Sequence, residues 1–234
     1  MYCLVFGDIL MRCIYATRPY EAVPGSTNEL HKKWVQKITD FVSTDKLVSH
    51  KKYKQYCREM VHDFDVLPRL DIQKPKVGIV GEILVKFMPM ANNYLADLLE
   101  SEGAEAVIPD LLDFFLYCFY NSNFKAEHLG MKKSTARLCN AGIALLEFFR
   151  KTARKELAAS KHFTPPSEIR DLAEMAKGFV SLGNQTGEGW FLTGEMLELI
   201  HSGVKKHYLH PAIWLPAKPH CRKRCDQGTA KELS

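Results

Sequence analysis

The first third of the chain carries apolar residues at helical spacing. The segment 26–42 repeats them every three or four positions, at Leu30, Trp34, Ile38 and Phe41. Ser26 and Glu29 have the spacing of a capping box at its start. A second helical pattern, 50–64, ends before Pro68, and an amphipathic helix opens the chain. We therefore expect residues 1–72 to form a helical N-terminal segment.

The pattern then changes from helical to β. A short β-branched run follows a proline, as is typical of a buried strand, at Val77, Ile79 and Val80. A helical segment, 89–104, comes next, and the run 105–109 predicts a second strand. Strand, helix and strand in this order form a βαβ unit with a parallel pair of strands. The sequence predicts an α/β fold in which a Rossmann-like parallel βαβ domain, 73–204, follows the helix-rich segment.

The end of the chain departs from this alternation. A glycine-rich loop, 183–189, precedes a last helix that ends at Gly203, and a buried strand should come next. The sequence Lys-Lys-His-Tyr-Leu-His-Pro, which begins at Lys205, lacks the β-branched pattern of a buried strand. We therefore expect no strand here, and we expect residues 205–234 to form a disordered tail.

Charge and cysteine content narrow the class of protein. The net charge is +5, and much of the excess lies in the tail, so the rest of the chain does not indicate nucleic-acid binding. The seven scattered cysteines lack the spacing of a secreted disulfide framework. No apolar run approaches the roughly 20 residues of a membrane span. A soluble, cytoplasmic protein without a nucleic-acid or membrane partner is predicted.

The exit from the first strand is one candidate ligand site. Ligands of open α/β sheets bind beyond the carboxyl ends of the strands, where Gly81 and Glu82 lie. Asn92 and Asn93 could present side-chain amides at the start of the next helix. The alternative is that Asn92 only caps that helix. The sequence GIVGEI is not a dinucleotide-binding fingerprint, so it does not support a nicotinamide cofactor.

The glycine-rich loop is the second candidate. Gly187 and Gly189 permit positive φ and close backbone approach, and they flank Glu188. The helix that follows offers free N–H groups to an anion such as a phosphate or a thioester oxygen. The alternative is an ordinary turn in which Trp190 anchors the core. No Gly-Lys-Ser/Thr closes the loop, so it is not a P-loop.

Cysteine and histidine give weaker candidates. Cys118 and Cys139 lie in apolar helical patterns, where cysteine is usually a small buried hydrophobe. The tail groups residues whose spacing does not match a zinc site, at His207, His210, His220, Cys221 and Cys225. We therefore assign no metal site and no catalytic residue.

Four phrases of the sequence stand out together: RPYE at 18–21, GEILVKF at 81–87, ANNYLADLLESEGAEAVIPDLLDFFLYCFYN at 91–121 and GEGWFLTGEMLELIHSGVK at 187–205. They resemble the carboxyl-terminal portion of acyl-CoA dehydratase activase-related proteins. That portion is similar to the subunits of 2-hydroxyacyl-CoA dehydratases such as 2-hydroxyglutaryl-CoA dehydratase. The resemblance covers most of residues 1–205.

The resemblance implies an oxygen-sensitive iron–sulfur protein, with a 4Fe–4S cluster, from the cytoplasm of an anaerobe. It implies a role in ATP-dependent electron transfer to CoA thioesters, or in their dehydration, which is lyase chemistry. The implied partners are an activase ATPase or other dehydratase subunits. The chain departs from the family at Met88 and Met90, where relatives have more polar residues.

A second departure lies at the end of the chain. Family members continue after SGVK with a strand and a cysteine loop of the form N-[IV]-[IV]-C-[VI]-Q-P-F-G-C-L-P-N-H-[VI]-x-G-K-G. Codons allowed for residues 206–228, read one nucleotide later, encode N-I-I-C-I-Q-P-F-G-C-L-P-N-H-I-A-G-K-G-V-I-K. This match indicates a frameshift near Lys205 or Lys206 that replaced the authentic segment with out-of-frame peptide.

The frameshift has consequences for the expected function. The chain would be a truncated member of the family, with the C-terminal part of its α/β domain missing. Without the cysteine loop, we expect it to bind no iron–sulfur cluster and to be inactive alone. The alternative is a non-catalytic α/β module that docks on an activase ATPase.

Overall fold

A computed structural model describes residues 1–43, 49–204 and 206–210, and the last five are described by their backbone alone. The chain forms two compact units. The first comprises Met1–Lys74 and Ala144–Pro166, and the second comprises Pro75–Ile143 and the described residues from Ser167 onward. One long helix, α7 (Lys133–Ala159), contributes to both units.

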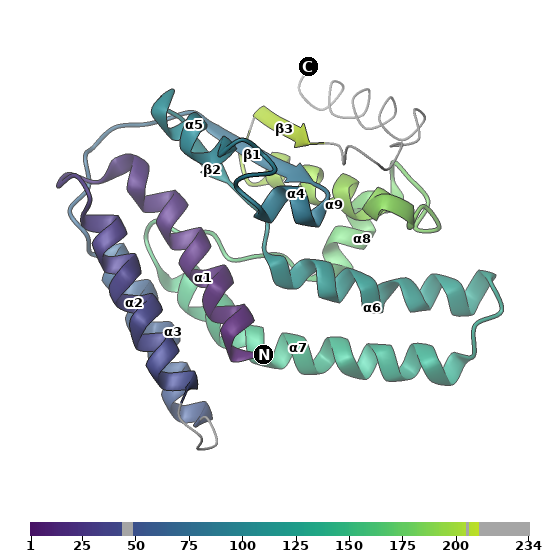
Figure 1. Cartoon of the computed structure of the whole chain (residues 1–234). Helices are drawn as coiled ribbons and strands as arrows, with labels where there is room; N and C mark the ends of the chain where they lie inside the picture. The colour runs from purple at the N-terminus through teal and green to yellow at the C-terminus, as the bar shows by residue number, and fades with distance from the viewer. Residues whose placement is uncertain (44–48, 205, 211–234) are drawn as a thin grey trace. The chain divides into compact units, whose positions relative to one another are not determined.

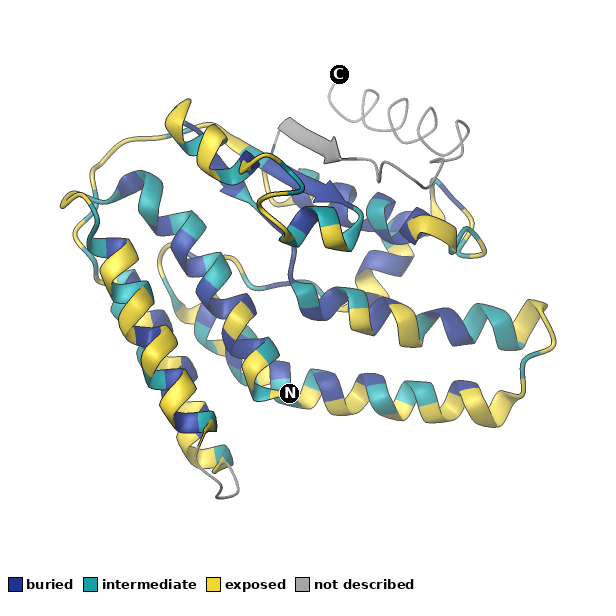
Figure 2. Cartoon of the chain, in the orientation of Figure 1, coloured by how far each residue is buried: buried dark blue, intermediate teal, exposed yellow. Residues whose placement is uncertain are grey.

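The first unit is helical, as the apolar spacing predicts. Besides its part of α7, it contains α1 (Tyr2–Thr17), the short 3₁₀ helix η1 (Arg18–Tyr20), α2 (Ser26–Val42) and α3 (His50–Asp65). Figure 2 shows buried positions alternating with exposed ones along these helices, as an amphipathic pattern requires. The predicted apolar face of α2 is confirmed, because Trp34, Ile38 and Phe41 are buried.

Aromatic side chains form much of this core. The Phe6 ring of α1 lies 5.2 Å from Tyr53 of α3 and 6.2 Å from Phe41 of α2, centroid to centroid. The polar atoms of the buried Trp34 and Tyr53 side chains have hydrogen-bond partners. Trp34 Nε1 donates to Asp63 Oδ2 at 3.1 Å, and the Tyr53 hydroxyl donates to the Phe149 carbonyl oxygen at 2.6 Å. The rings therefore bury large apolar areas without leaving these donors unpaired.

The start of α2 differs from the predicted capping box. Ser26 is the first helical residue, and the preceding Gly25 has positive φ. The carboxylate of Glu21 accepts hydrogen bonds from the Gly25 and Thr27 backbone N–H groups, at 2.6 and 2.9 Å. The chain folds back between residues 21 and 25, so Glu21 takes the role that the spacing assigned to Glu29. Glu21, the last residue of the RPYE phrase, therefore stabilises the start of α2.

The two candidate caps of α2 can be separated by mutation. We expect Glu21→Ala to lower the free energy of unfolding by about 1 kcal/mol, the usual loss for a helix cap. Glu29→Ala, the matched control, should change it by less than about 0.5 kcal/mol, as at an ordinary surface position. Urea denaturation followed by circular dichroism measures both. A larger loss of stability for Glu29→Ala than for Glu21→Ala would support the capping box instead.

The second unit contains a small parallel sheet covered by helices (Figure 1). The strands are β1 (Lys76–Gly81), β2 (Glu105–Val107) and β3 (Lys206–His210), and β1 lies between the other two. Both neighbours run parallel to β1. The helices are α4 (Ile83–Phe87), α5 (Leu95–Ser101), α6 (Leu111–His128), α8 (Ile169–Lys177), η2 (Thr186–Glu188) and α9 (Gly189–His201). The prediction of a mixed α/β fold with a parallel pair is confirmed.

The strand β3 corrects the expectation that no strand follows Gly203. Residues 206–210 pair with β1 along Val77 to Gly81, with His210 opposite Gly81. Sheet pairing uses backbone groups, and without β3 this side of β1 would leave buried N–H and C=O groups without partners. The β-branched pattern is therefore not required here. The rest of the predicted tail, 211–234, lies outside the described residues.

Helix α9 covers the sheet. Val80 of β1 packs with Met196 and Leu199 of α9 and with Val204 in one buried apolar cluster. On its other side α9 approaches α8 closely, because Gly194 faces the backbone of Leu172. None of the helices within the described ranges is long and apolar enough to cross a membrane.

Candidate functional site at the β1 edge

The carboxyl end of β1 leads directly into the first candidate residues. Gly81 ends the strand, and Glu82 caps α4 by accepting a hydrogen bond from the Val85 N–H at 3.1 Å. Because β1 has parallel neighbours on both sides, this end is where the chain connections diverge, and ligands of parallel sheets favour such a place. The predicted position of Gly81 and Glu82 at a strand exit is confirmed.

A buried ion pair lies next to this strand end. Lys86 of α4 and Glu195 of α9 are joined by a bond of 2.7 Å between Nζ and Oε1. Their side chains are only 2% and 0% exposed. A buried charge costs free energy unless it is paired, so each residue depends on the other. Sequence reasoning missed both residues, although a lysine and a glutamate inside the apolar phrases GEILVKF and GWFLTGEMLELI were a signal.

Glu195 is electrostatically unusual. Burial raises the pKa of its carboxyl to about 7, against the opposing effect of Lys86. Its second oxygen, Oε2, is buried and has no hydrogen-bond partner among the described residues. A carboxyl with a pKa near neutrality can exchange a proton at physiological pH.

Glu188 lies at the same strand end. It has left-handed backbone angles (φ 57°, ψ 24°) and follows Gly187, which is also left-handed. Burial raises the pKa of its carboxyl, and the charge of Glu82 raises it further, whereas a hydrogen bond from the Ile83 N–H opposes the shift. Its Oε2 is buried too, and no described residue donates a hydrogen bond to it. We call Glu82, Lys86, Glu188 and Glu195 the edge site.

The other residues of the glycine-rich loop serve the fold. Gly189 begins α9 against Asn184, so closely that an added Cβ would lie 2.7 Å from the Asn184 carbonyl oxygen. The Trp190 N–H donates to the same oxygen at 2.9 Å. Trp190 is fully buried, and its Nε1 donates to Asn121 Oδ1 at 2.8 Å. The loop therefore places Glu188 at the edge site, while Trp190 is a core anchor. The anion site predicted at this helix start stays a prediction.

Asn92 and Asn93 differ in their surroundings. Asn92 Nδ2 donates to the Val85 and Lys86 carbonyl oxygens, at 2.9 and 3.2 Å, and its Oδ1 accepts from the Leu95 N–H at 3.1 Å. Asn93 is exposed, with a φ of 56°. Asn92 thus joins the end of α4 to the start of α5, which favours the capping alternative.

The two asparagines make a matched pair for mutation. We expect Asn92→Ala to lower the free energy of unfolding by about 1–2 kcal/mol, because three backbone groups lose their partner. Asn93→Gly should cost less than about 0.5 kcal/mol, because glycine adopts positive φ readily. Thermal denaturation of both variants measures the difference. Equal losses would contradict the role given to Asn92.

The described cysteines do not fit an iron–sulfur cluster. Within residues 1–43, 49–204 and 206–210, no group of three or more histidine, cysteine, aspartate or glutamate side chains could hold a metal ion. Burial raises the pKa of Cys57 to about 12 and that of Cys13 as well, which disfavours the thiolate form that ligates iron. Of the tail residues weighed for zinc, His220, Cys221 and Cys225 lie outside the described ranges, as do the side chains of His207 and His210.

Comparisons of the chain with known proteins found no match. No family model matches the sequence. The curated proteins give no match, and neither do the solved structures. The function therefore has to be argued from the residues and their geometry.

Proposed function

We propose that the chain is a piece of a 2-hydroxyacyl-CoA dehydratase- or activase-related iron–sulfur protein, and that its edge site receives the thioester end of an acyl-CoA. The Rossmann-like character of its second unit is part of this proposal. By itself the chain is expected to be inactive, because its described residues offer no ligand set for a cluster. When present in an intact relative, the cluster supplies the electron for thioester reduction.

One observation carries the proposal. Two of the phrases that resemble the family, GEILVKF and GEGWFLTGE, lie about 100 residues apart and meet at the carboxyl end of β1. Lys86 binds Glu195 there, and the Ile83 N–H binds Glu188. If the two phrases resemble the family because they form one binding site, they should lie together in the fold, and they do.

The edge site has groups that suit a thioester. In its protonated form, which the raised pKa favours, Glu188 can donate a hydrogen bond from Oε2 to a carbonyl oxygen. Glu195, which is paired with Lys86, can take up or release a proton near neutral pH. Lys86 fixes Glu195 and does not itself need to reach the substrate.

Binding measurements with Glu188 variants test the thioester assignment. Calorimetric titration with a 2-hydroxyacyl-CoA should show tighter binding than titration with free CoA. Glu188→Gln keeps a hydrogen-bond donor and should retain this preference. Glu188→Leu should bind the 2-hydroxyacyl-CoA about tenfold more weakly, which is the effect of losing one hydrogen bond. Equal affinity for the thioester and for CoA, or no loss in Glu188→Leu, would contradict the assignment.

A second function is favoured by a different observation. The segment around α4 and α5 exposes large apolar side chains, as protein–protein contact surfaces do, at Leu84, Met88, Met90, Tyr94 and Leu98. This surface supports the alternative of a non-catalytic module that docks on an activase ATPase. Co-purification with such an ATPase that Met90→Gln abolishes, together with no thioester binding, would establish the alternative in place of the first proposal.

A further inference from the structure

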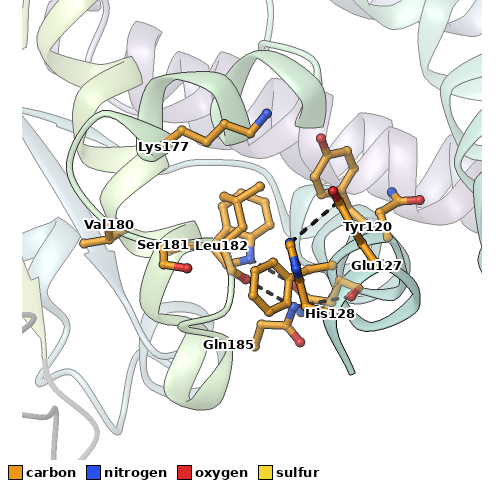
Figure 3. A pocket seen from close by; sticks show the side chains of 12 residues that line it. Tyr120, Glu127, His128, Lys177, Val180, Ser181, Leu182 and Gln185 are labelled. Atoms are coloured by element: carbon orange, nitrogen blue, oxygen red, sulfur yellow. Dashed lines mark hydrogen bonds and ion pairs between the residues drawn. The ribbon is translucent and has the colours of Figure 1, made fainter. Parts of the chain in front are cut away.

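A pocket of about 310 Å³ lies in the second unit (Figure 3). One wall is the second half of α6, and the other is the segment from the end of α8 to the start of α9. None of the four edge-site residues lines it. The inference drawn from this pocket is therefore independent of the proposed function.

Aromatic rings dominate the α6 wall. Tyr120, Phe124 and His128 follow one another at intervals of four residues, which places them on one face of the helix. The Phe124 and His128 rings are 4.4 Å apart, centroid to centroid. Trp190 lies behind them, 5.8 Å from Tyr120, and is fully buried. The Tyr120, Phe124 and His128 rings, which are not fully buried, offer a stacking surface to a planar ligand.

The floor of the pocket is held in one arrangement. Asn121 Oδ1 accepts from Trp190, and Gln185 Nε2 donates to the Asn121 and Leu182 carbonyl oxygens, at 3.3 and 3.1 Å. Phe124 packs on Gly183, where an added Cβ would lie 2.5 Å from its ring. A wall fixed in this way loses little conformational freedom when a ligand binds.

The mouth of the pocket carries charged groups. Lys177 extends toward Tyr120 (Figure 3), and its Nζ is paired with the exposed Glu174 at 2.5 Å. An exposed ion pair contributes little stability, so Lys177 can exchange this partner for an anion on a ligand. Glu127 also lines the pocket beside His128, with 3.7 Å between Oε2 and Nε2, and its negative charge acts on Lys177 as well. Its carboxylate can accept a hydrogen bond from an amino group.

We propose that this pocket binds a purine nucleoside monophosphate. The base would stack on the α6 rings with its amino edge toward Glu127, and the phosphate would bind Lys177. The size agrees, because small-ligand pockets begin at about 300 Å³. Inorganic phosphate could not stack on the aromatic rings, and an uncharged aromatic molecule could not form an ion pair with Lys177.

Calorimetric titration of the full chain with AMP, adenosine and inorganic phosphate tests the proposal. AMP should bind about tenfold more tightly than adenosine, because it adds one charge-assisted contact. Inorganic phosphate should bind more weakly than adenosine. Lys177→Gln should reduce AMP affinity to that of adenosine and leave adenosine unchanged. Phe124→Leu should weaken AMP and adenosine alike, by about fivefold or more.

The matched control is Lys133→Gln, which removes an exposed lysine that does not line the pocket. It should bind all three compounds like the wild-type chain. Three results would each overturn the proposal: no saturable binding of AMP, equal affinity for AMP and adenosine, or unchanged AMP binding in Lys177→Gln. Lys177 lies at the surface, so this variant is expected to fold and to give a clear answer.

Discussion

Replacing Glu195 by leucine should lower the free energy of unfolding by about 3–5 kcal/mol, the loss expected when one partner of a buried ion pair is removed. Lys86 Nζ would then be buried without an acceptor, since its side chain is only 2% exposed. Lys86→Met should cost less, because Glu195 can take up a proton when its cation is removed. The double variant Lys86→Met/Glu195→Leu should recover most of the loss, because no uncompensated charge remains.

The matched control for this pair is Glu195→Gln, whose amide oxygen can still accept from Lys86. The folded-state pKa of Glu195 is about 7, above its ordinary value of 4.5, so the folded state holds the proton more tightly. The stability that Glu195 contributes is therefore fully present below pH 4.5 and is lost as the pH rises toward 7. Wild type should lose stability relative to Glu195→Gln across this window. Urea denaturation between pH 4.5 and 7.5 measures it, and a constant difference would contradict the burial effect.

The second large effect concerns the glycines of α9. Gly189→Ala and Gly194→Ala should each cost about 3 kcal/mol, the upper end of the range for overpacking. At both positions an added Cβ meets backbone, at 2.7 Å from the Asn184 carbonyl oxygen and 2.9 Å from the Leu172 carbonyl oxygen. Backbone cannot move aside as a flexible side chain can. The glycines are thus required by close packing of α9 against its neighbours.

Gly178→Ala is the control for the glycine variants. Gly178 lies in the same unit at the end of α8, with right-handed helical angles, and the nearest atom to an added Cβ is 3.7 Å away. We expect it to leave stability unchanged or to raise it by up to about 1 kcal/mol. Thermal unfolding of the three variants compares them directly. If Gly194→Ala were as stable as Gly178→Ala, the close approach of α8 and α9 would be refuted.

Local patterns predicted the elements whose stability is local. The apolar spacing of α2 and the β-branched run of β1 depend on each segment's own buried face, and both predictions hold. The strand β3 was missed because it depends on the backbone of β1, which lies more than 120 residues earlier. The cap of α2 was misassigned to Glu29, because the turn that returns Glu21 to the helix has no periodic signal.

The candidate site was predicted in part for a similar reason. Glu82 and Glu188 stand beside glycines at the ends of predicted elements, so general rules about strand ends and loops pointed to them. Lys86 and Glu195 lie inside apolar helices, and only the three-dimensional structure brings them together. The same rules pointed to Asn92, and the structure shows its side chain bonded only to backbone groups of α4 and α5, as a helix cap would be.

The nucleotide sequence of the gene tests the central claim, descent from a dehydratase- or activase-related protein, most directly. Genomic DNA covering the codons of residues 204–228 should be sequenced and translated one nucleotide later from Lys206. We expect this frame to read N-I-I-C-I-Q-P-F-G-C-L-P-N-H-I-A-G-K-G and to stay open. Codons that give an unrelated peptide or a stop in that frame would contradict the frameshift and, with it, the strongest sign of that descent.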